Sequence, residues 1–139
     1  MKKLVLDSSV IIKWLNTTDE KDVKKADKLL LEFEKSKIDI FVPFLVKFEI
    51  PNALLKGKKM AISEAADALD ALQKFPFNYK DFDYDLMVAA YQIAYDYNLT
   101  FYDSSFIALA ENLSCSLITA KVKHQTKIQG IHIIPLSQY

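Results

Sequence analysis

Short apolar runs recur along this chain, separated by longer segments in which apolar side chains return every three or four positions. The short runs have the length and the β-branched or aromatic content of buried strands. They lie at residues 3–6 (KLVL), 39–42 (DIFV), 77–79 (FNY), 99–102 (LTFY), 116–119 (SLIT) and 131–136 (IHIIPL). We predict a strand in each.

The segments between these runs have helical spacing. In residues 19–35, for example, Ala26, Leu29 and Phe33 fall on one side of a helix whose other side is charged. We predict helices at residues 10–15, 19–35, 44–56, 63–74, 84–97 and 105–112. Strands that alternate with helices predict a three-layer α/β/α sandwich with a central, mainly parallel sheet. A chain of 139 residues suits a single domain over residues 1–139.

Composition excludes several classes of site. Only 2 glycines are present, so a glycine-rich phosphate loop is not expected. Cys115 is the only cysteine, which rules out an intrachain disulfide and favours a cytoplasmic location. No apolar stretch is long enough for a bilayer span. The 18 basic residues balance 18 acidic ones, so function must be sought in local clusters.

An Asp-Ser-Ser sequence occurs twice, in VLDSSVI (residues 5–11) and FYDSSFI (residues 101–107). Each copy stands where a predicted strand gives way to a predicted helix. Because the carboxyl ends of parallel strands share one edge of a sheet, Asp7 and Asp103 are expected to face each other there. Helix capping is the competing interpretation, and for either aspartate alone it is the favoured one.

A third acid, Glu49, lies on a largely apolar face of the helix predicted over residues 44–56. A carboxylate in that position needs a metal or a partner such as a buried lysine. Pro51, two residues later, either distorts or ends this helix. Three carboxylates at one edge of a sheet suit Mg²⁺ or Mn²⁺, which prefer oxygen ligands.

The segments VLDSSVIIKWL, VPFLVKFEIPNALL and TFYDSSFIALAENL, in this order, resemble the PIN-domain family and most closely its VapC-type toxin ribonucleases. The likeness covers nearly the whole chain. It implies a metal-dependent endoribonuclease in which Asp7, Glu49 and Asp103 are the catalytic residues and the ligands of Mg²⁺ or Mn²⁺. Supporting roles through hydrogen bonds fall to Ser8 and Asn52.

The chain departs from the family at one position. Family members usually carry a fourth acid in a strand that ends Thr-Ala-Asp, whereas this chain has Thr119, Ala120 and Lys121. Thr119 and Lys121 are therefore assigned as further supporting residues, and Lys121 and Lys123 as contacts to RNA. Lys121 also keeps open an alternative, a catalytically degenerate PIN-fold module that only binds RNA or a protein.

The resemblance also implies partners: an RNA substrate, a small antitoxin protein and a second copy of the chain in a homodimer. Apolar side chains on the first long helices, among them Phe33, Phe44 and Phe48, are the expected contacts.

Overall fold

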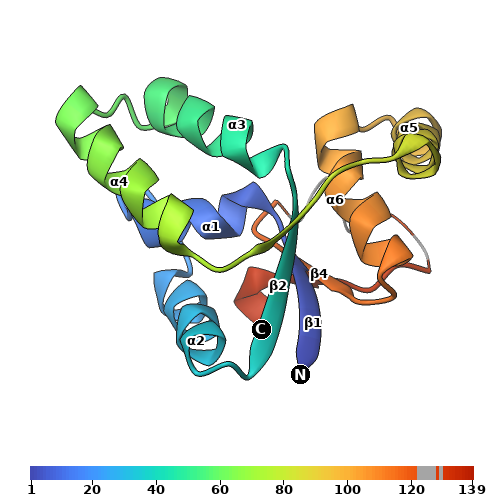
Figure 1. Ribbon diagram of the computed structural model, residues 1–139, viewed down its shortest axis with the longest axis horizontal. Coiled ribbons are helices and arrows are strands. Elements are labelled where there is room, and N and C mark those ends of the chain that lie inside the picture. Colours follow the sequence, from blue (N-terminus) through green and yellow to red (C-terminus); the bar gives the residue numbers. More distant parts are fainter. Residues whose placement is uncertain (122–127, 129) are drawn as a thin grey trace.

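The computed structural model describes residues 1–121, 128 and 130–139, and every structural statement below concerns those residues. Strands and helices alternate along the chain (Figure 1). In chain order they are β1 (Lys2–Leu6), α1 (Ser8–Leu15), α2 (Val23–Glu34), β2 (Ile38–Pro43), α3 (Val46–Asn52), the π-helix η1 (Ala53–Gly57), α4 (Ile62–Lys74), β3 (Asn78–Lys80), α5 (Tyr84–Tyr97), α6 (Phe101–Asn112), β4 (Ser116–Thr119), β5 (Ile133–Pro135) and the 3₁₀ helix η2 (Leu136–Gln138).

The strands form one parallel sheet in the order β3-β2-β1-β4-β5. β1 lies at the centre, pairing Leu4 with Ile40 of β2 and with Ser116 of β4. Since all strands run in the same direction, the residues that follow β1, β2 and β4 gather at one edge. This edge carries the candidate site described below.

Helices cover both faces of the sheet, which confirms the predicted three-layer sandwich. In Figure 1, α5 and α6 lie on one side of the strands, whereas α1 to α4 lie on the other. Both faces of β1 are therefore buried, and Leu4, Val5 and Leu6 are each 0% exposed. Burial on both sides explains why the strand reads as a continuous apolar run instead of an alternating one.

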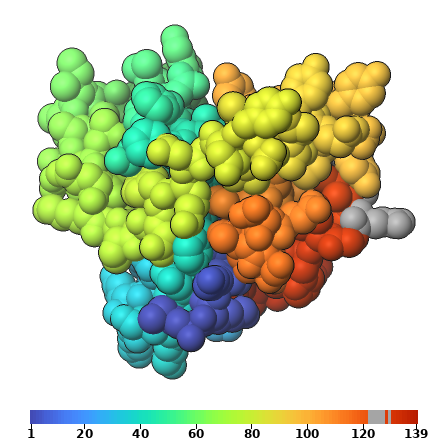
Figure 2. Space-filling model, turned by 45° about the vertical axis from the view of Figure 1, so that its right-hand side comes forward, coloured from blue at the N-terminus to red at the C-terminus, as the bar shows by residue number. Residues whose placement is uncertain are grey.

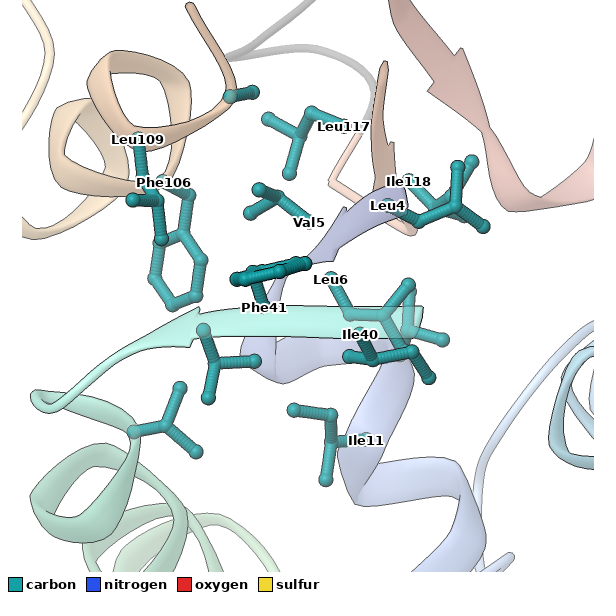
Figure 3. Close-up of a cluster of buried hydrophobic side chains, with 14 of the residues drawn as sticks. Leu4, Val5, Leu6, Ile11, Ile40, Phe41, Phe106, Leu109, Leu117 and Ile118 are labelled. Atoms are coloured by element: carbon teal, nitrogen blue, oxygen red, sulfur yellow. The ribbon is translucent and has the colours of Figure 1, made fainter. Parts of the chain in front are cut away.

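The core on the two faces is built from different helices (Figure 3). Phe106 and Leu109 of α6 lie near Val5, and Ile11 of α1 lies near Ile40. α6 contributes an unbroken buried stretch from Ser104 to Ala110. It is thus an inner helix, with α5 outside it.

α5 forms part of the surface above α6 (Figure 2). Tyr84, Tyr91 and Tyr95 are 74%, 66% and 77% exposed, so an apolar side of this helix faces outward. Within the described residues, no helix combines the length and the apolar character needed to cross a membrane.

The predicted strand at residues 99–102 is wrong. α6 begins at Phe101, and Thr100 is its N-cap, accepting a hydrogen bond from the backbone N–H of Asp103 at 3.0 Å. The preceding Asn98 has φ +53° and ends α5, which leaves only a short turn between the two helices. A favourable N-cap therefore outweighs the strand propensity of the following Phe-Tyr pair.

Two helix boundaries also differ from prediction. α2 begins at Val23 instead of residue 19, because Asp19 and Asp22 have left-handed backbone conformations, with φ of +58° and +54°. The helix predicted over residues 44–56 continues through Pro51 but changes to the π-helix η1 at Ala53. Proline has no backbone N–H to donate, and a wider turn is one way for a helix to continue beyond it.

Candidate active site

Asp7 directly follows β1 and is 1% exposed. Its backbone N–H donates to the carbonyl oxygen of Ile118 at 3.0 Å, which extends the pairing of β1 with β4 by one residue. Its Oδ2 accepts hydrogen bonds from the hydroxyls of Thr119 at 2.8 Å and Ser9 at 3.0 Å. Although Asp7 occupies the N-cap position of α1, its side chain makes no capping bond. The capping interpretation is therefore wrong for this residue.

Glu49 is half-buried on α3 and faces the start of α1. Its Oε1 accepts a hydrogen bond from the Ser8 hydroxyl at 2.8 Å. Burial raises the pKa of the Glu49 carboxyl, and repulsion from Asp7 and Asp103 adds to this, against the lowering effects of the Ser8 hydrogen bond and of Lys121. No lysine among the described residues forms a direct salt bridge with Glu49.

Asp103 is the third residue of α6, within its first turn instead of at its cap. Its Oδ1 lies 3.6 Å from the Nζ of Lys121, and the Asp103 side chain is 14% exposed. The capping interpretation is wrong here too, since the capping side chain is that of Thr100.

Lys121 follows β4 and completes the group. Burial by itself lowers the pKa of its ammonium, but attraction to Asp7, Asp103 and Glu49 outweighs burial, so the pKa is raised. The Lys121 Nζ lies 3.6 Å from Asp103, and the side chain as a whole is 45% exposed. The structure thus brings together Lys121 and all three acids that the sequence singled out.

A set of hydroxyl groups fixes this arrangement. The backbone N–H of Lys121 donates to the Thr119 hydroxyl at 2.9 Å, and that of Ala120 donates to the Ser9 hydroxyl at 3.1 Å. The same two hydroxyls hold Asp7. The chain after β4 is therefore tied to the start of α1 through the groups that orient the central carboxylate.

The sequence analysis did not single out Ser9, although the signal was present as the second serine of the first Asp-Ser-Ser copy. The second copy has another role. Ser105 donates to the carbonyl oxygen of Tyr102 at 2.6 Å, and Ser104 is 0% exposed inside α6. The repeated sequence therefore places both aspartates at the site but only the serines of the first copy beside them.

One predicted supporting residue stands apart from this group. Asn52 is exposed near the end of α3, and within the described residues its side chain makes no hydrogen bond to the three acids. Lys123, which was predicted to contact RNA, lies outside the described residues.

The donor set suits a hard divalent cation in its chemistry. Carboxylates from the end of β1, from α3 and from α6 all act on one cation here, the Lys121 ammonium, which stands in for an ion. As they stand, however, no group of three His, Cys, Asp or Glu side chains in the described part of the chain is close enough to hold a metal together. A bound ion therefore requires the acids to close around it and the ammonium to give way.

The cavity beside the acids has a volume of about 610 Å³, within the range of small-molecule sites. Its lining includes Ser8, Glu49 and Lys121, together with Lys13, Glu20 and Lys58. Of the three acids, Glu49 is thus the one that lines the cavity.

Comparison with known proteins identifies one matching family. The family model of the PIN domain matches residues 4–123. None of the curated proteins compared with this sequence matches it.

Several solved structures share the fold. VapBC2 from Rickettsia felis, bound to a DNA fragment of its promoter, is 13% identical with a TM-score of 0.71, over 96% of this chain and 98% of that one. PAE2754 from Pyrobaculum aerophilum is 23% identical with a TM-score of 0.68, over 98% and 90%. VapC20 from Mycobacterium tuberculosis, a toxin that cleaves the sarcin–ricin loop, is 13% identical with a TM-score of 0.65, over 84% and 87%. At these identities the likeness establishes the fold, and it confirms the fold predicted from sequence.

Proposed function

Because this chain belongs to the PIN-domain family, we propose that it is a metal-dependent endoribonuclease and the toxin of a toxin–antitoxin pair. The observation that carries the proposal is the convergence of Asp7, Glu49 and Asp103, from three separate elements, on the single cation of Lys121. The RNA-cleaving activity of the structurally similar toxin VapC20 supports RNA as the substrate class.

The three acids are the catalytic residues and the ligands of Mg²⁺ or Mn²⁺. A divalent ion held by them supplies positive charge that polarises the scissile phosphodiester and activates water. Asp7 is oriented for this task by the hydroxyls of Thr119 and Ser9. Asp103 lies opposite, where the ammonium of Lys121 is also available to a phosphate oxygen.

Glu49 is the acid best suited to accept a proton from the attacking water. Burial raises its pKa, and a base whose pKa lies closer to the working pH transfers protons more effectively. The Ser8 hydroxyl donates to Oε1 of Glu49, and both residues line the cavity. Ser8 is thus a positioning residue.

The test is cleavage of RNA by purified protein with Mg²⁺, with Mn²⁺ and with EDTA. Asp7→Asn, Glu49→Gln and Asp103→Asn are each expected to lower cleavage at least 100-fold while the circular dichroism spectrum remains that of wild type. Lys74→Gln, which changes an exposed lysine on α4, is the matched control. Cleavage that is equal in EDTA and with Mg²⁺ would contradict metal dependence.

A second candidate is a PIN-fold module that binds RNA or a protein without cleaving. Lys121 favours it, because a fixed ammonium among the acids opposes a divalent ion. RNA binding by wild type, combined with no cleavage under any divalent ion, would establish this candidate.

The proposed partners are an antitoxin and a second copy of the chain, in the cytoplasm. Support comes from similar structures that are VapBC complexes, including the DNA-bound complex from Salmonella typhimurium. Phe44 and Phe48 are 40% and 68% exposed close to Glu49 in sequence and supply apolar contacts. Phe33 does not, since it is 8% exposed in the core. A strict monomer in light scattering, with no partner encoded beside it, would count against this assignment.

A further inference from the structure

The cavity lined by Glu49 and Lys121 is also lined by a second cluster of charges, formed by Lys13 of α1, Glu20 and Lys58. Neither lysine of this cluster belongs to the group formed by Lys121 and the three acids, and neither has a role in the nuclease function proposed above. Their side chains are nevertheless only 5% and 12% exposed, and that of Glu20 is 16% exposed. Burying three charges is costly, so their position at the wall of this cavity calls for an explanation.

Glu20 binds both lysines, one with each carboxylate oxygen. The Nζ of Lys13 donates to Oε1 at 2.8 Å, and the Nζ of Lys58 donates to Oε2 at 2.7 Å. Lys13 also donates to the carbonyl oxygen of Lys21 at 2.6 Å, and Lys58 donates to that of Thr18. Because an ammonium has three N–H groups, each lysine retains a donor beyond these bonds.

The cluster carries a net positive charge at neutral pH. Burial raises the pKa of Glu20, but the hydrogen bonds from Lys13 and Lys58 outweigh burial and hold the pKa below its ordinary value. Glu20 is therefore ionised, and one carboxylate faces two ammonium groups. The two ammonium groups therefore outnumber the carboxylate that they share, and their remaining N–H donors suit an anion, even though Asp19, Asp22 and Lys21 add one net negative charge to the cavity lining.

The cluster also has a fixed geometry. Lys58 follows the π-helix η1, and its backbone N–H donates to the carbonyl oxygen of Ala53 at 3.0 Å. Asp19 and Asp22, on either side of Glu20, adopt left-handed conformations that turn the chain along the cavity wall. The ion pair with Lys13 thus fixes Glu20, and Glu20 in turn fixes Lys58.

We propose that this cluster is a subsite for an RNA backbone phosphate next to the scissile one, with Lys58 as the residue that contacts it and Glu20 as its positioning residue. This inference rests on the nuclease function proposed above. The cluster and Glu49 line the same cavity of about 610 Å³, which has room for a nucleotide. Phosphate contacts by lysine supply much of the affinity of proteins for nucleic acids.

The test uses the full chain with Asp7→Asn, so that RNA is bound and not cleaved, and measures affinity by fluorescence anisotropy. A set of RNA oligonucleotides carries one neutral methylphosphonate linkage each, moved step by step along the strand. One linkage is expected to weaken binding about tenfold, the size of a charge-assisted contact. Lys58→Gln should weaken binding to unmodified RNA by a similar factor and should lose the sensitivity at that linkage.

The controls separate this subsite from general charge and from folding. Lys74→Gln removes the same charge far from the cavity and should keep the full sensitivity. Lys58→Arg should retain much of it, and the thermal melt reports whether each variant is folded. The slope of log affinity against log salt concentration should also become shallower by about one in Lys58→Gln, as expected for the loss of one phosphate contact.

Equal sensitivity of wild type and Lys58→Gln to every linkage, no sensitive linkage in wild type, or no RNA binding at all would overturn the subsite. Failure of the nuclease function has a different signature. If wild type never cleaves RNA but the linkage pattern depends on Lys58, the subsite stands in a non-cleaving module. If RNA is cleaved and the pattern does not depend on Lys58, the nuclease stands and the cluster only stabilises the fold.

Discussion

Replacing Lys121 with glutamine should tighten the binding of Mn²⁺. The ammonium lies 3.6 Å from Asp103, where an effective dielectric of about 20 gives roughly 5 kcal/mol of gross attraction. The Lys121 side chain is 45% exposed, so solvent screening reduces the net value to about 1 kcal/mol. The ammonium is thus held among the acids, but weakly enough to be displaced.

The effect on an ion follows from the same charges. A dication about 5 Å from the ammonium would meet roughly 2 kcal/mol of repulsion even at the dielectric of water, and several times more at a dielectric of about 20. Taking the lower figure, we expect Lys121→Gln to lower the Kd for Mn²⁺ at least tenfold. Lys121→Asp should lower it further, because it restores the acid usual in the family.

Calorimetric titration of Mn²⁺ into the two variants and wild type measures these constants. The Mn²⁺-induced rise in melting temperature, which should be larger in both variants, provides an independent readout. Lys74→Gln, whose exposed lysine pairs with Asp70 at 2.9 Å, should leave both quantities unchanged. If neither Lys121 variant changes the Kd, the ammonium does not compete with the ion and the electrostatic reasoning fails.

Cleavage rates of the same variants then identify the role of the amine. Faster cleavage together with tighter Mn²⁺ binding would mean that Lys121 limits a nuclease site. Slower cleavage despite tighter binding would mean that the amine contacts the scissile phosphate and contributes fixed positive charge.

Two further predictions concern stability. Burial raises the pKa of Glu49 in the folded state, so protonated Glu49 favours folding at low pH. This contribution to stability is lost as the pH rises through the raised pKa. Glu49→Gln should therefore raise the melting temperature at pH 7, and this gain should disappear below about pH 4. An equal gain at both pH values would contradict this. Thr119→Val removes the 2.8 Å hydrogen bond to Asp7 and the 2.9 Å hydrogen bond from the Lys121 N–H. It should lower the free energy of unfolding, measured in urea, by about 1–3 kcal/mol. The control Thr17→Val, at an exposed position, should lower it by less than about 0.5 kcal/mol. Equal costs for the two threonines would show that the Thr119 hydroxyl does not support the site.

Much of the fold could be predicted because its signals are local. The strand predicted at residues 116–119 coincides with β4, and the helix predicted at residues 84–97 coincides with α5. The strand predicted at residues 99–102 was wrong because strand propensity and helix capping compete there, and the outcome depends on the sharp turn at Asn98. Local pattern alone does not decide such a competition.

The convergence of the acids could be predicted only in part for a similar reason. Asp7 follows a strongly apolar strand, and its place at the edge of the parallel sheet is as predicted. Asp103 reaches the same edge from the first turn of α6, because residues 99–102 form no strand. The cluster of Lys13, Glu20 and Lys58 could not be predicted. Its members meet only because the chain near Glu20 turns through left-handed residues and because η1 shifts the end of α3. Nothing in a short window of sequence reports either event.

The Lys121 ammonium offsets the repulsion among the three acids when no metal ion is bound. Three carboxylates that approach each other in a partly buried site repel, and each loses hydration, so the group needs a positive charge to remain together. Here the fold supplies that charge from the end of β4, two residues after the threonine that orients Asp7. Since the Lys121 side chain is 45% exposed, the amine can leave to solvent without moving the backbone, which the Thr119 hydroxyl holds. The acids can therefore stay assembled around the ammonium and exchange it for an external cation or share it with a phosphate, so one side chain decides between the two candidate functions.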